Sequence, residues 1–281
     1  MCRIFAQIAT RPYDPTDYLV DSDCSLLAQS KTKKTMLQKD GWGVASYHGG
    51  RCELTKTANP IYKEVPLLKK TAHRANSKIV VAHVRWASNP LKLPIKQLIA
   101  EEHAQPFVEK SLSFAHNGTI NIAVQAREAL GPLKKKLKGK NDSEIYFWLL
   151  NKWFLKTRSV PKALECVSKE LWELWKSTPP KERKEFKKPY TGLNVAVSDG
   201  KKLYALCHSL MPQTRWSLCL GDQPYNRLAY RLDPEGNRLI LGSEKLSKEP
   251  GWEIMPMHSI LEAWPSGNKI NIKIRNFKWP N

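Results

Sequence analysis

The chain opens with the stretch Met1-Cys2-Arg3-Ile4-Phe5-Ala6-Gln7, which places a cysteine directly behind the initiating methionine. We expect Met1 to be removed, because initiator methionine is normally cleaved when the second residue is small. Cys2 would then carry both a nucleophilic thiol and a free α-amine, whose ordinary pKa of about 7.7–8 suits a general base. The alternative is that Cys2 is simply a small apolar residue that opens a first strand.

Length and composition predict a globular protein of one large domain or two small ones. The chain has 281 residues, of which 41% are hydrophobic and 26% charged, so it can build a sizeable core. No apolar run reaches the roughly 18 residues that a membrane-spanning helix needs. The N-terminal stretch also lacks the apolar segment of a secretory signal. We therefore expect a cytoplasmic protein with no part in a membrane.

The cysteines are spread through apolar segments, and they are Cys2, Cys24, Cys52, Cys166, Cys207 and Cys219. None of them forms a Cys-x-x-Cys pair, and none pairs with histidine at zinc-finger spacing. In a cytoplasmic chain this pattern predicts reduced, mostly buried thiols. We accordingly expect no disulfide, no metal and no cofactor.

The formal net charge of +20 is the feature that would suit a nucleic-acid partner. Much of the excess lies in two lysine-rich runs, residues 134–140 and 181–188, beside prolines or glycines in predicted loops. Neither run carries the interleaved aromatic residues that stack on bases. Solvated surface loops are therefore favoured over nucleic-acid binding.

Hydrophobic periodicity predicts strands toward both ends of the chain and helices in the middle. Strands are expected at 2–9, with Ile4, Ala6 and Ile8 on one face, and at 44–47, 78–86, 112–115, 194–197, 203–207, 237–242, 252–255, 260–264 and 270–274. Helices are expected at 23–30, 67–75 and 120–130, then behind an Asp142 cap, and around residues 164–174. This order predicts an α+β layered domain with two sheets, rather than a parallel βαβ sheet.

Polar residues at strand ends and turns supply what hydrolysis of an amino-acid side-chain amide needs. Arg85 can hold an α-carboxylate bidentately, and Asp142 can pair with an α-ammonium. Cys2 can attack the amide carbon, while the Asn117 side chain and the Gly118 backbone N–H stabilise the developing oxyanion. Each residue also has an ordinary structural interpretation: a surface charge for Arg85, a turn for the Asn-Gly pair, and a helix cap for Asp142.

These residues lie in motifs that follow one another along the chain. The motifs are Met1-Cys2-Arg3-Ile4, Asp40-Gly41-Trp42-Gly43, His83-Val84-Arg85-Trp86-Ala87-Ser88, Phe114-Ala115-His116-Asn117-Gly118 and Asn141-Asp142-Ser143-Glu144. In this order and rough spacing the chain resembles the class II glutamine amidotransferases over residues 1–150. Further on, Gly242-Ser243-Glu244-Lys245-Leu246 resembles the C-terminal strands of their free-standing branch, which includes γ-glutamyl hydrolases. The resemblance implies a four-layer αββα sandwich of the N-terminal-nucleophile hydrolases.

The resemblance also implies a role for each matching residue. Cys2 matches the nucleophile, and Asn117 with Gly118 matches the oxyanion hole. The implied substrate-binding residues are Arg85 for the carboxylate, Ser88 as the small hydroxyl residue that helps to hold the substrate, and Asp142 for the α-amine. The implied cycle is attack by the Cys2 thiolate, loss of ammonia or an amine, and hydrolysis of a γ-glutamyl thioester by water.

The chain departs from the family pattern ahead of the Asn-Gly strand. Many relatives read Asn-x-His-Pro-Phe there, whereas this chain reads His103-Ala104-Gln105-Pro106-Phe107. We expect Pro106 and Phe107 to shape the turn, and we interpret His103 as a structural histidine rather than a site residue. The natural γ-glutamyl compound stays open.

The favoured interpretation is a single glutamine amidotransferase domain, residues 1–281, that hydrolyses glutamine or another γ-glutamyl compound. The residues after 150 are expected to complete the sandwich, so ammonia is either released or passed to a synthase in trans. Two alternatives stay open. One is an N-terminal cysteine acylase acting on a non-glutamyl amide, for which Arg85 and Asp142 would have no use. The other is a catalytically inactive basic binding module on the same fold.

Overall fold

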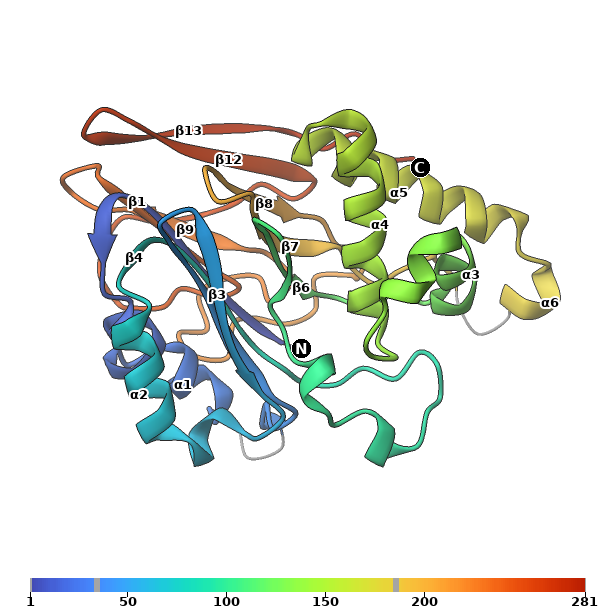
Figure 1. The fold of residues 1–281 in the computed structure, drawn as a ribbon, viewed down its shortest axis with the longest axis horizontal. Helices are drawn as coiled ribbons and strands as arrows, with labels where there is room; N and C mark the ends of the chain where they lie inside the picture. The colour runs from blue at the N-terminus through green and yellow to red at the C-terminus, as the bar shows by residue number, and fades with distance from the viewer. Residues whose placement is uncertain (1, 33–35, 184–186, 281) are drawn as a thin grey trace.

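Two antiparallel sheets packed face to face form the centre of the protein (Figure 1), in a computed structural model that describes residues 2–32, 36–183 and 187–280. The first sheet has the strand order β11 (Trp252–Ile254), β9 (Ala229–Leu232), β10 (Arg238–Gly242), β1 (Arg3–Tyr13), β4 (Ser77–Val84), β2 (Trp42–His48) and β3 (Arg51–Thr57). The second has the order β13 (Lys269–Asn276), β12 (Ser259–Ser266), β8 (Leu203–Cys207), β7 (Asn194–Ser198), β6 (Leu112–Asn117) and β5 (Phe107–Glu109). The strand that follows Cys2 is therefore the central strand of its sheet.

Helices cover the outer face of each sheet, which makes four layers (Figure 1). The first sheet carries α1 (Leu26–Ser30) and α2 (Val65–Arg74), with short helical turns at Asp17–Asp21 and Ile61–Lys63. The second carries α3 (Ala123–Glu128), α4 (Asp142–Thr157) and α5 (Val160–Ser177), and α6 (Pro180–Arg183) follows. Short 3-10 helices lie at Ile95–Gln97, Glu101–His103 and Gly131–Lys136. The expected αββα layering, an α+β fold, is confirmed.

Side chains of β1 point alternately to its two faces and so contribute to two of the three buried hydrophobic clusters. Ile4, Ala6 and Ile8 face the second sheet and pack in the cluster between the sheets. Phe5 points the other way, into the cluster beneath the first sheet's helices. Because side chains alternate across a strand, residues 3–9 are buried on both faces of the sheet.

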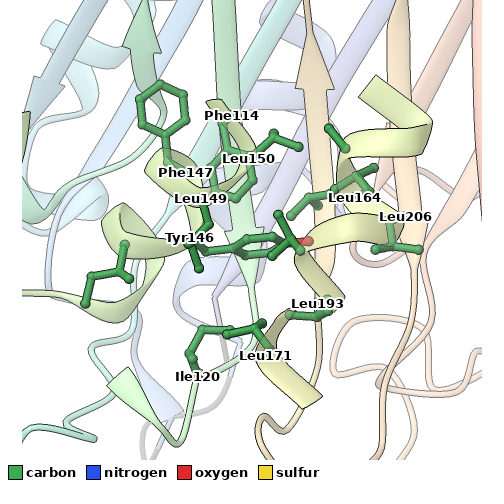
Figure 2. Close-up of a cluster of buried hydrophobic side chains, with 14 of the residues drawn as sticks. Phe114, Ile120, Tyr146, Phe147, Leu149, Leu150, Leu164, Leu171, Leu193 and Leu206 are labelled. Carbon is green, nitrogen blue, oxygen red and sulfur yellow. The ribbon is translucent and has the colours of Figure 1, made fainter. Parts of the chain in front are cut away.

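The third cluster lies between the second sheet and its helices (Figure 2). Tyr146 of α4 packs edge-on against Phe114 of β6, with ring centroids 5.1 Å apart. Leu164 and Leu171, on the apolar face of α5, complete the layer beside Leu206 of β8. This packing fixes the start of α4, which carries Asp142, against the end of β6, which carries Asn117.

Several expected elements differ from the structure at their ends. The helix expected at 120–130 is shorter, Ala123–Glu128, and the N-cap of α4 is Asn141 rather than Asp142. The sequence patterns missed β3, β5 and β9. The two lysine-rich runs begin in the short helices Gly131–Lys136 and α6 rather than in loops, and residues 184–186 lie outside the described residues.

The expectation of six reduced thiols is wrong. Cys24 and Cys219 form a disulfide, with Cα atoms 5.9 Å apart and 195 residues between them in sequence, whereas Cys2, Cys52, Cys166 and Cys207 are free. Cys24 precedes α1, and Cys219 lies in the long connection between β8 and β9. Only the packing of that connection against the α1 region brings the two sulfur atoms together, so spacing along the chain did not reveal the pair.

Across the described parts of the chain, no helix combines the length and the apolar character that crossing a membrane requires.

Candidate active site

Three strand ends meet at one end of the sandwich and bring the expected site residues together. Cys2 precedes β1, whose Arg3 pairs with Val84 of β4, so that Arg85 and Trp86 emerge beside Cys2. From the other sheet, β6 ends at Asn117. The Nε2 atom of His83 lies 3.2 Å from the carbonyl oxygen of His116, which ties β4 to β6 across the sandwich at this point.

The Cys2 sulfur lies against the backbone of Trp86. It accepts a hydrogen bond from the Trp86 N–H at 3.3 Å, and the thiol donates to the Trp86 carbonyl at 3.4 Å. Burial raises the pKa of the Cys2 thiol above its ordinary value, while the positive charge of the chain's terminal amine and the Trp86 N–H act in the opposite direction. The resting thiol is therefore protonated at neutral pH and needs a base before it can attack.

Asn117 and Gly118 lie next to Cys2. The Asn117 Nδ2 donates to the Cys2 carbonyl oxygen at 3.0 Å, and an amide nitrogen carries a second proton for a further acceptor. A Cβ at position 118 would lie 2.0 Å from the carbonyl oxygen of Gly192. Only glycine therefore allows the chain to pass so close to residue 192, and Gly118 lines the same cavity as Cys2.

Arg85 is buried, so the interpretation as a surface charge is wrong. It is 3% exposed, and its Nη1 donates to the carbonyl oxygens of Leu98 at 2.6 Å and Asp40 at 3.3 Å. Asp40 in turn accepts from the Ala87 N–H at 2.8 Å. The guanidinium is thus held by two backbone carbonyls, and its other N–H groups could donate to a carboxylate.

Asp142 is also buried, at 1% exposed. Its carboxylate accepts from the Ile120 N–H at 2.7 Å and from the Ser88 hydroxyl at 3.3 Å. The cap interpretation is wrong for this residue, because the Asn141 side chain accepts the Glu144 N–H and caps α4. Burial raises the pKa of Asp142, and the nearby positive charge of Arg85 opposes that rise.

A cavity of about 280 Å³ opens above these residues. Its lining includes Cys2, Ser88, Asn117 and Gly118 of the expected site, together with Trp86, Ala87, Thr119, Thr191 and Met211. Arg85 and Asp142 are not among the lining residues. Asp142 contacts Ser88, which does line the cavity. Arg85 lies close enough to Cys2 and to Asp142 for its charge to act on both. A second cavity of about 200 Å³ adjoins the first, with which it shares Trp86 and Met211.

Comparison with known proteins identifies the family of this chain. A family model described as glutamine amidotransferases class-II matches residues 1–270. The chain belongs to the class-II glutamine amidotransferases. Hydrolysis or transfer of the glutamine amide is the general chemistry of that family.

Two curated relatives resemble this amidotransferase in part. The protein YafJ of Escherichia coli (strain K12), a glutamine amidotransferase by name, is 27% identical over 175 residues, which cover 60% of each chain. A glutamine–fructose-6-phosphate aminotransferase (isomerizing) of Sulfurisphaera tokodaii is 22% identical over 223 residues, which cover 76% of this chain and 36% of that protein. The chain thus spans less than two thirds of either relative.

Solved structures show the same fold. A glutamine aminotransferase class-II domain protein from Silicibacter pomeroyi aligns with a TM-score of 0.65 at 21% identity, covering 99% of this chain and all of that one. The glutamine phosphoribosylpyrophosphate amidotransferase of B. subtilis aligns at 0.63 and 14% identity, covering 99% of this chain and 49% of that one. At these identities the likeness concerns the fold, and it agrees with the two-sheet sandwich.

The departure at residues 103–107 of this amidotransferase has a structural explanation. His103 donates from Nδ1 to the Leu98 carbonyl at 3.0 Å and accepts the Lys140 N–H at Nε2 at 2.8 Å. Gln105 accepts the His116 N–H at 2.7 Å. The structural interpretation of His103 agrees with these contacts. The segment supports the Leu98 carbonyl, which holds Arg85, and the end of β6.

Sequence patterns missed the other walls of the cavity. Thr119 directly follows the Asn-Gly motif, so its position was available from that motif. Thr191 and Met211 come from connections far along the chain, and no local signal marked them. Among the described residues, no group of three His, Cys, Asp or Glu side chains gathers as a metal site requires.

Proposed function

We propose that this protein hydrolyses the γ-amide of glutamine or of another γ-glutamyl compound, with Cys2 as the nucleophile. The observation that supports the proposal most directly is the convergence at one cavity. A thiol, an amide donor and a glycine line it, and a buried cation, Arg85, and a buried anion, Asp142, lie close enough to Cys2 for their charges to act on its thiol. An amino acid with two opposite charges and a distal amide fits that set of groups.

The proposed reaction begins with the Cys2 thiol, whose pKa burial raises. Once Met1 is removed, the α-amine of Cys2 takes the thiol proton, because its ordinary pKa of about 7.7–8 lies close to neutral pH. The thiolate attacks the amide carbon, and Asn117 with the Gly118 N–H stabilises the oxyanion. The C–N bond then breaks, the leaving nitrogen takes the proton, and water hydrolyses the γ-glutamyl thioester to glutamate.

Arg85 and Asp142 would recognise the two ends of the amino acid. Arg85 binds the α-carboxylate with the N–H donors that remain beyond its two carbonyl partners. Asp142 pairs with the α-ammonium, and the Ser88 hydroxyl between Asp142 and the cavity joins that contact. An acylase for apolar amides would gain nothing from burying these two charges.

The adjoining cavity favours substrates larger than glutamine. Met36, Pro212 and Arg215 line it together with the shared Trp86 and Met211. Ammonia, the leaving group of glutamine, needs no such space, whereas a substituent on the amide nitrogen would enter it. We therefore propose that γ-glutamyl amides of a bulky amine are substrates in addition to glutamine. When glutamine is the substrate, the alternative to release of ammonia is its transfer to a synthase in trans.

We further propose that residues 1–281 work as one domain in the cytoplasm. The family match to residues 1–270 supports a single unit, since it includes strands of both sheets and the helices on both faces. Disulfides in a reducing cytoplasm are usually transient or redox-sensing. In that compartment the Cys24–Cys219 bond would therefore be of this kind.

Glutamate release by the Cys2→Ala variant tests the proposal. We expect the wild type to release glutamate from glutamine and from γ-glutamyl anilide, and Cys2→Ala to release none while its circular dichroism is unchanged. Cys52→Ala is the matched control, since Cys52 is also a free, half-buried thiol, and it should keep full activity. Intact mass should show that Met1 is absent.

Retained activity in Cys2→Ala would refute the nucleophile. A wild type that lacks Met1 but releases no glutamate from either substrate would instead favour the inactive binding module or the acylase.

A further inference from the structure

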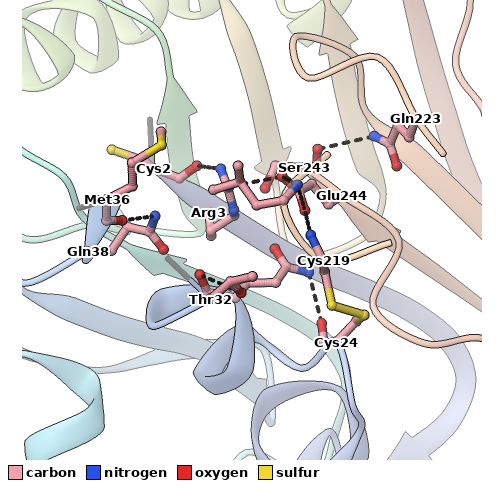
Figure 3. Close-up of polar contacts among 12 residues, drawn as sticks. Cys2, Arg3, Cys24, Thr32, Met36, Gln38, Cys219, Gln223, Ser243 and Glu244 are labelled. Carbon is pink, nitrogen blue, oxygen red and sulfur yellow. Dashed lines mark hydrogen bonds and ion pairs between the residues drawn. A yellow bond between two sulfur atoms is a disulfide. The ribbon is translucent and has the colours of Figure 1, made fainter. Parts of the chain in front are cut away.

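The Cys2 carbonyl oxygen is held by two donors, and one of them belongs to a buried ion pair. Asn117 Nδ2 donates to this oxygen at 3.0 Å and Arg3 Nη1 donates at 3.1 Å. Arg3 Nη2 lies 2.9 Å from a carboxylate oxygen of Glu244, and both side chains are 1% exposed (Figure 3). The orientation of the nucleophilic residue therefore depends on a charged pair inside the fold.

Stability alone is a poor explanation for this pair. A buried ion pair is often no better for stability than well-packed apolar residues, because both charges lose their hydration. The pair has a geometric consequence instead. Arg3 lies at the start of the central strand β1, and Glu244 follows β10, its neighbour in the sheet. The Arg3 guanidinium contacts both groups: Nη2 pairs with the Glu244 carboxylate, and Nη1 donates to the Cys2 carbonyl oxygen.

Glu244 is itself held by a connection that has no helix or strand. Its carboxylate accepts the Leu218 N–H at 2.9 and 3.0 Å and the Cys219 N–H at 3.2 Å. Both donors lie in residues 208–228, between β8 and β9. The Cys24–Cys219 disulfide fastens this connection to the segment before α1 (Figure 3), where Gln29 donates to the Cys24 carbonyl at 2.8 Å.

We propose that Arg3 and Glu244 are positioning residues for Cys2, and that the Cys24–Cys219 disulfide holds Glu244 in the geometry this role needs. The proposal rests on the proposed role of Cys2 as nucleophile. The contacts run without a break from the disulfide to the Cys219 N–H, the Glu244 carboxylate, the Arg3 guanidinium and the Cys2 carbonyl.

Reduction of the disulfide by a dithiol would change the position of Glu244 and, through Arg3, that of Cys2. The dithiol becomes a disulfide, and two electrons and two protons pass to the sulfur atoms of Cys24 and Cys219. The 208–228 connection is then released from the α1 region, and Glu244 loses the fixed direction of its N–H donors. Arg3 holds the Cys2 carbonyl less firmly, and the sulfur is aligned for attack in a smaller fraction of molecules.

The first test compares Glu244→Gln and Arg3→Lys with the wild type. We expect kcat for glutamine to fall about tenfold with KM within about twofold, because alignment of the nucleophile is lost and substrate contacts are not. Alkylation of Cys2 by iodoacetamide, located by peptide mapping, should slow by a similar factor. Glu262→Gln is the matched control: Glu262 pairs with Lys202 at 2.6 Å in the second sheet, and its loss should change neither rate.

The second test addresses the disulfide and does not require the buried pair to be broken. In the Cys24→Ser/Cys219→Ser double variant we expect the lower kcat and the slower alkylation of Cys2, and a dithiol should change neither further. The wild type should move to the same values on reduction. Melting temperatures measured in parallel separate loss of positioning from loss of the fold.

Two results would overturn the proposal. One is a wild-type rate of Cys2 alkylation in folded Glu244→Gln and in the double-serine variant. The other is a protein isolated with Cys24 and Cys219 unlinked and fully active. Alkylation of Cys2 does not depend on which amide is the substrate, so failure to hydrolyse glutamine refutes the proposed function and leaves this test valid.

Discussion

Among the residues that the structure describes, no cation directly contacts the buried carboxylate of Asp142. The carboxylate accepts from the Ile120 N–H, from the Ser88 hydroxyl and from the backbone of Asp142 itself, and Arg85 acts on it through its charge. A buried negative charge is costly unless it is paired. In the proposed function the α-ammonium of a substrate pairs with this carboxylate, and a neutral side chain at position 142 would avoid the cost of burying the charge.

Acid should weaken substrate binding through Asp142. Burial raises the pKa of Asp142 above its ordinary value, so its protonation begins at a higher pH than for an exposed carboxyl, and protonated Asp142 cannot pair with an ammonium. We expect KM for glutamine to rise as the pH is lowered, and to begin rising at a higher pH than an exposed carboxyl would give. Asp142→Asn should have a high KM with no such rise. Asp199→Asn, in the turn after β7, is the control that should follow the wild type.

The same substitution should stabilise the protein. A carboxyl whose pKa is raised on folding favours the folded state below its unfolded pKa, and that contribution is lost as pH rises. At neutral pH, Asp142→Asn removes the buried charge and should therefore raise the melting temperature. An unchanged KM together with an unchanged melting temperature would contradict both the binding role and the cost of burial.

At the scale of elements, the start of α4 is the part that positions the proposed amine site. Asn141 accepts the Glu144 N–H at 2.7 Å and donates to the His103 carbonyl at 3.0 Å. Glu144 accepts the N–H groups of Lys138 and Gly139 at 2.8 and 2.7 Å. These contacts fix the first turn of the helix and with it the direction of the neighbouring carboxylate.

Removal of this cap should affect both stability and binding. Asn141→Ala should lower the free energy of unfolding by about 1 kcal/mol, the usual cost of an N-cap, and should raise KM for glutamine because the first turn loosens. Ser159→Ala removes the cap of α5, which accepts the Lys162 N–H, and should cost stability without changing KM. Urea unfolding and initial rates measure the two effects. Equal KM values in both variants would mean that the cap has no part in the site.

Whether a strand could be predicted from the sequence depended on its length and its place in the sheet. Strands with a buried face, such as β4 and β7, were predicted because burial imposes a regular apolar pattern. β3, β5 and β9 were missed. β3 and β5 are edge strands; β3 has no buried residue and β5 has only three residues. β9 lies inside the first sheet and is largely buried, but its four residues are too few to show a regular pattern.

At the scale of the whole molecule, histidines are enclosed within the sandwich. Burial lowers the pKa of His83 and of His208 to about 3, and that of His116 to about 4. His116 lies 3.0 Å from the Ser143 hydroxyl and 3.1 Å from the Gly192 carbonyl, so it joins β6 to α4 and to the segment before β7. All three are neutral in the folded protein.

Stability should therefore fall in acid. An unfolded histidine takes up a proton near pH 6.5 while the folded one does not, so the free energy of unfolding decreases as pH falls from about 6.5 toward 4 for His116 and toward 3 for the other two. For His116 alone the loss reaches about 3 kcal/mol. Urea midpoints from pH 7 to pH 4 measure it. His73→Gln, at an exposed pair with Asp14, should leave the decline in place, and a constant midpoint would refute the prediction.

Local patterns in the sequence determined the layered α+β architecture, the position of the candidate nucleophile and the set of residues gathered around it, because periodicity and short motifs act over a few neighbouring residues. Only the tertiary structure decided that Cys24 joins Cys219, that Asn141 rather than Asp142 caps α4, that Arg85 is buried, and that Thr191 and Met211 form walls of the cavity. The disulfide, the burial of Arg85 and the two cavity walls depend on which distant segments pack together, and such contacts leave no regular spacing along the chain. The distant contacts of Asp142 with Ile120 and Ser88 occupy its carboxylate, while the neighbouring Asn141 caps the helix.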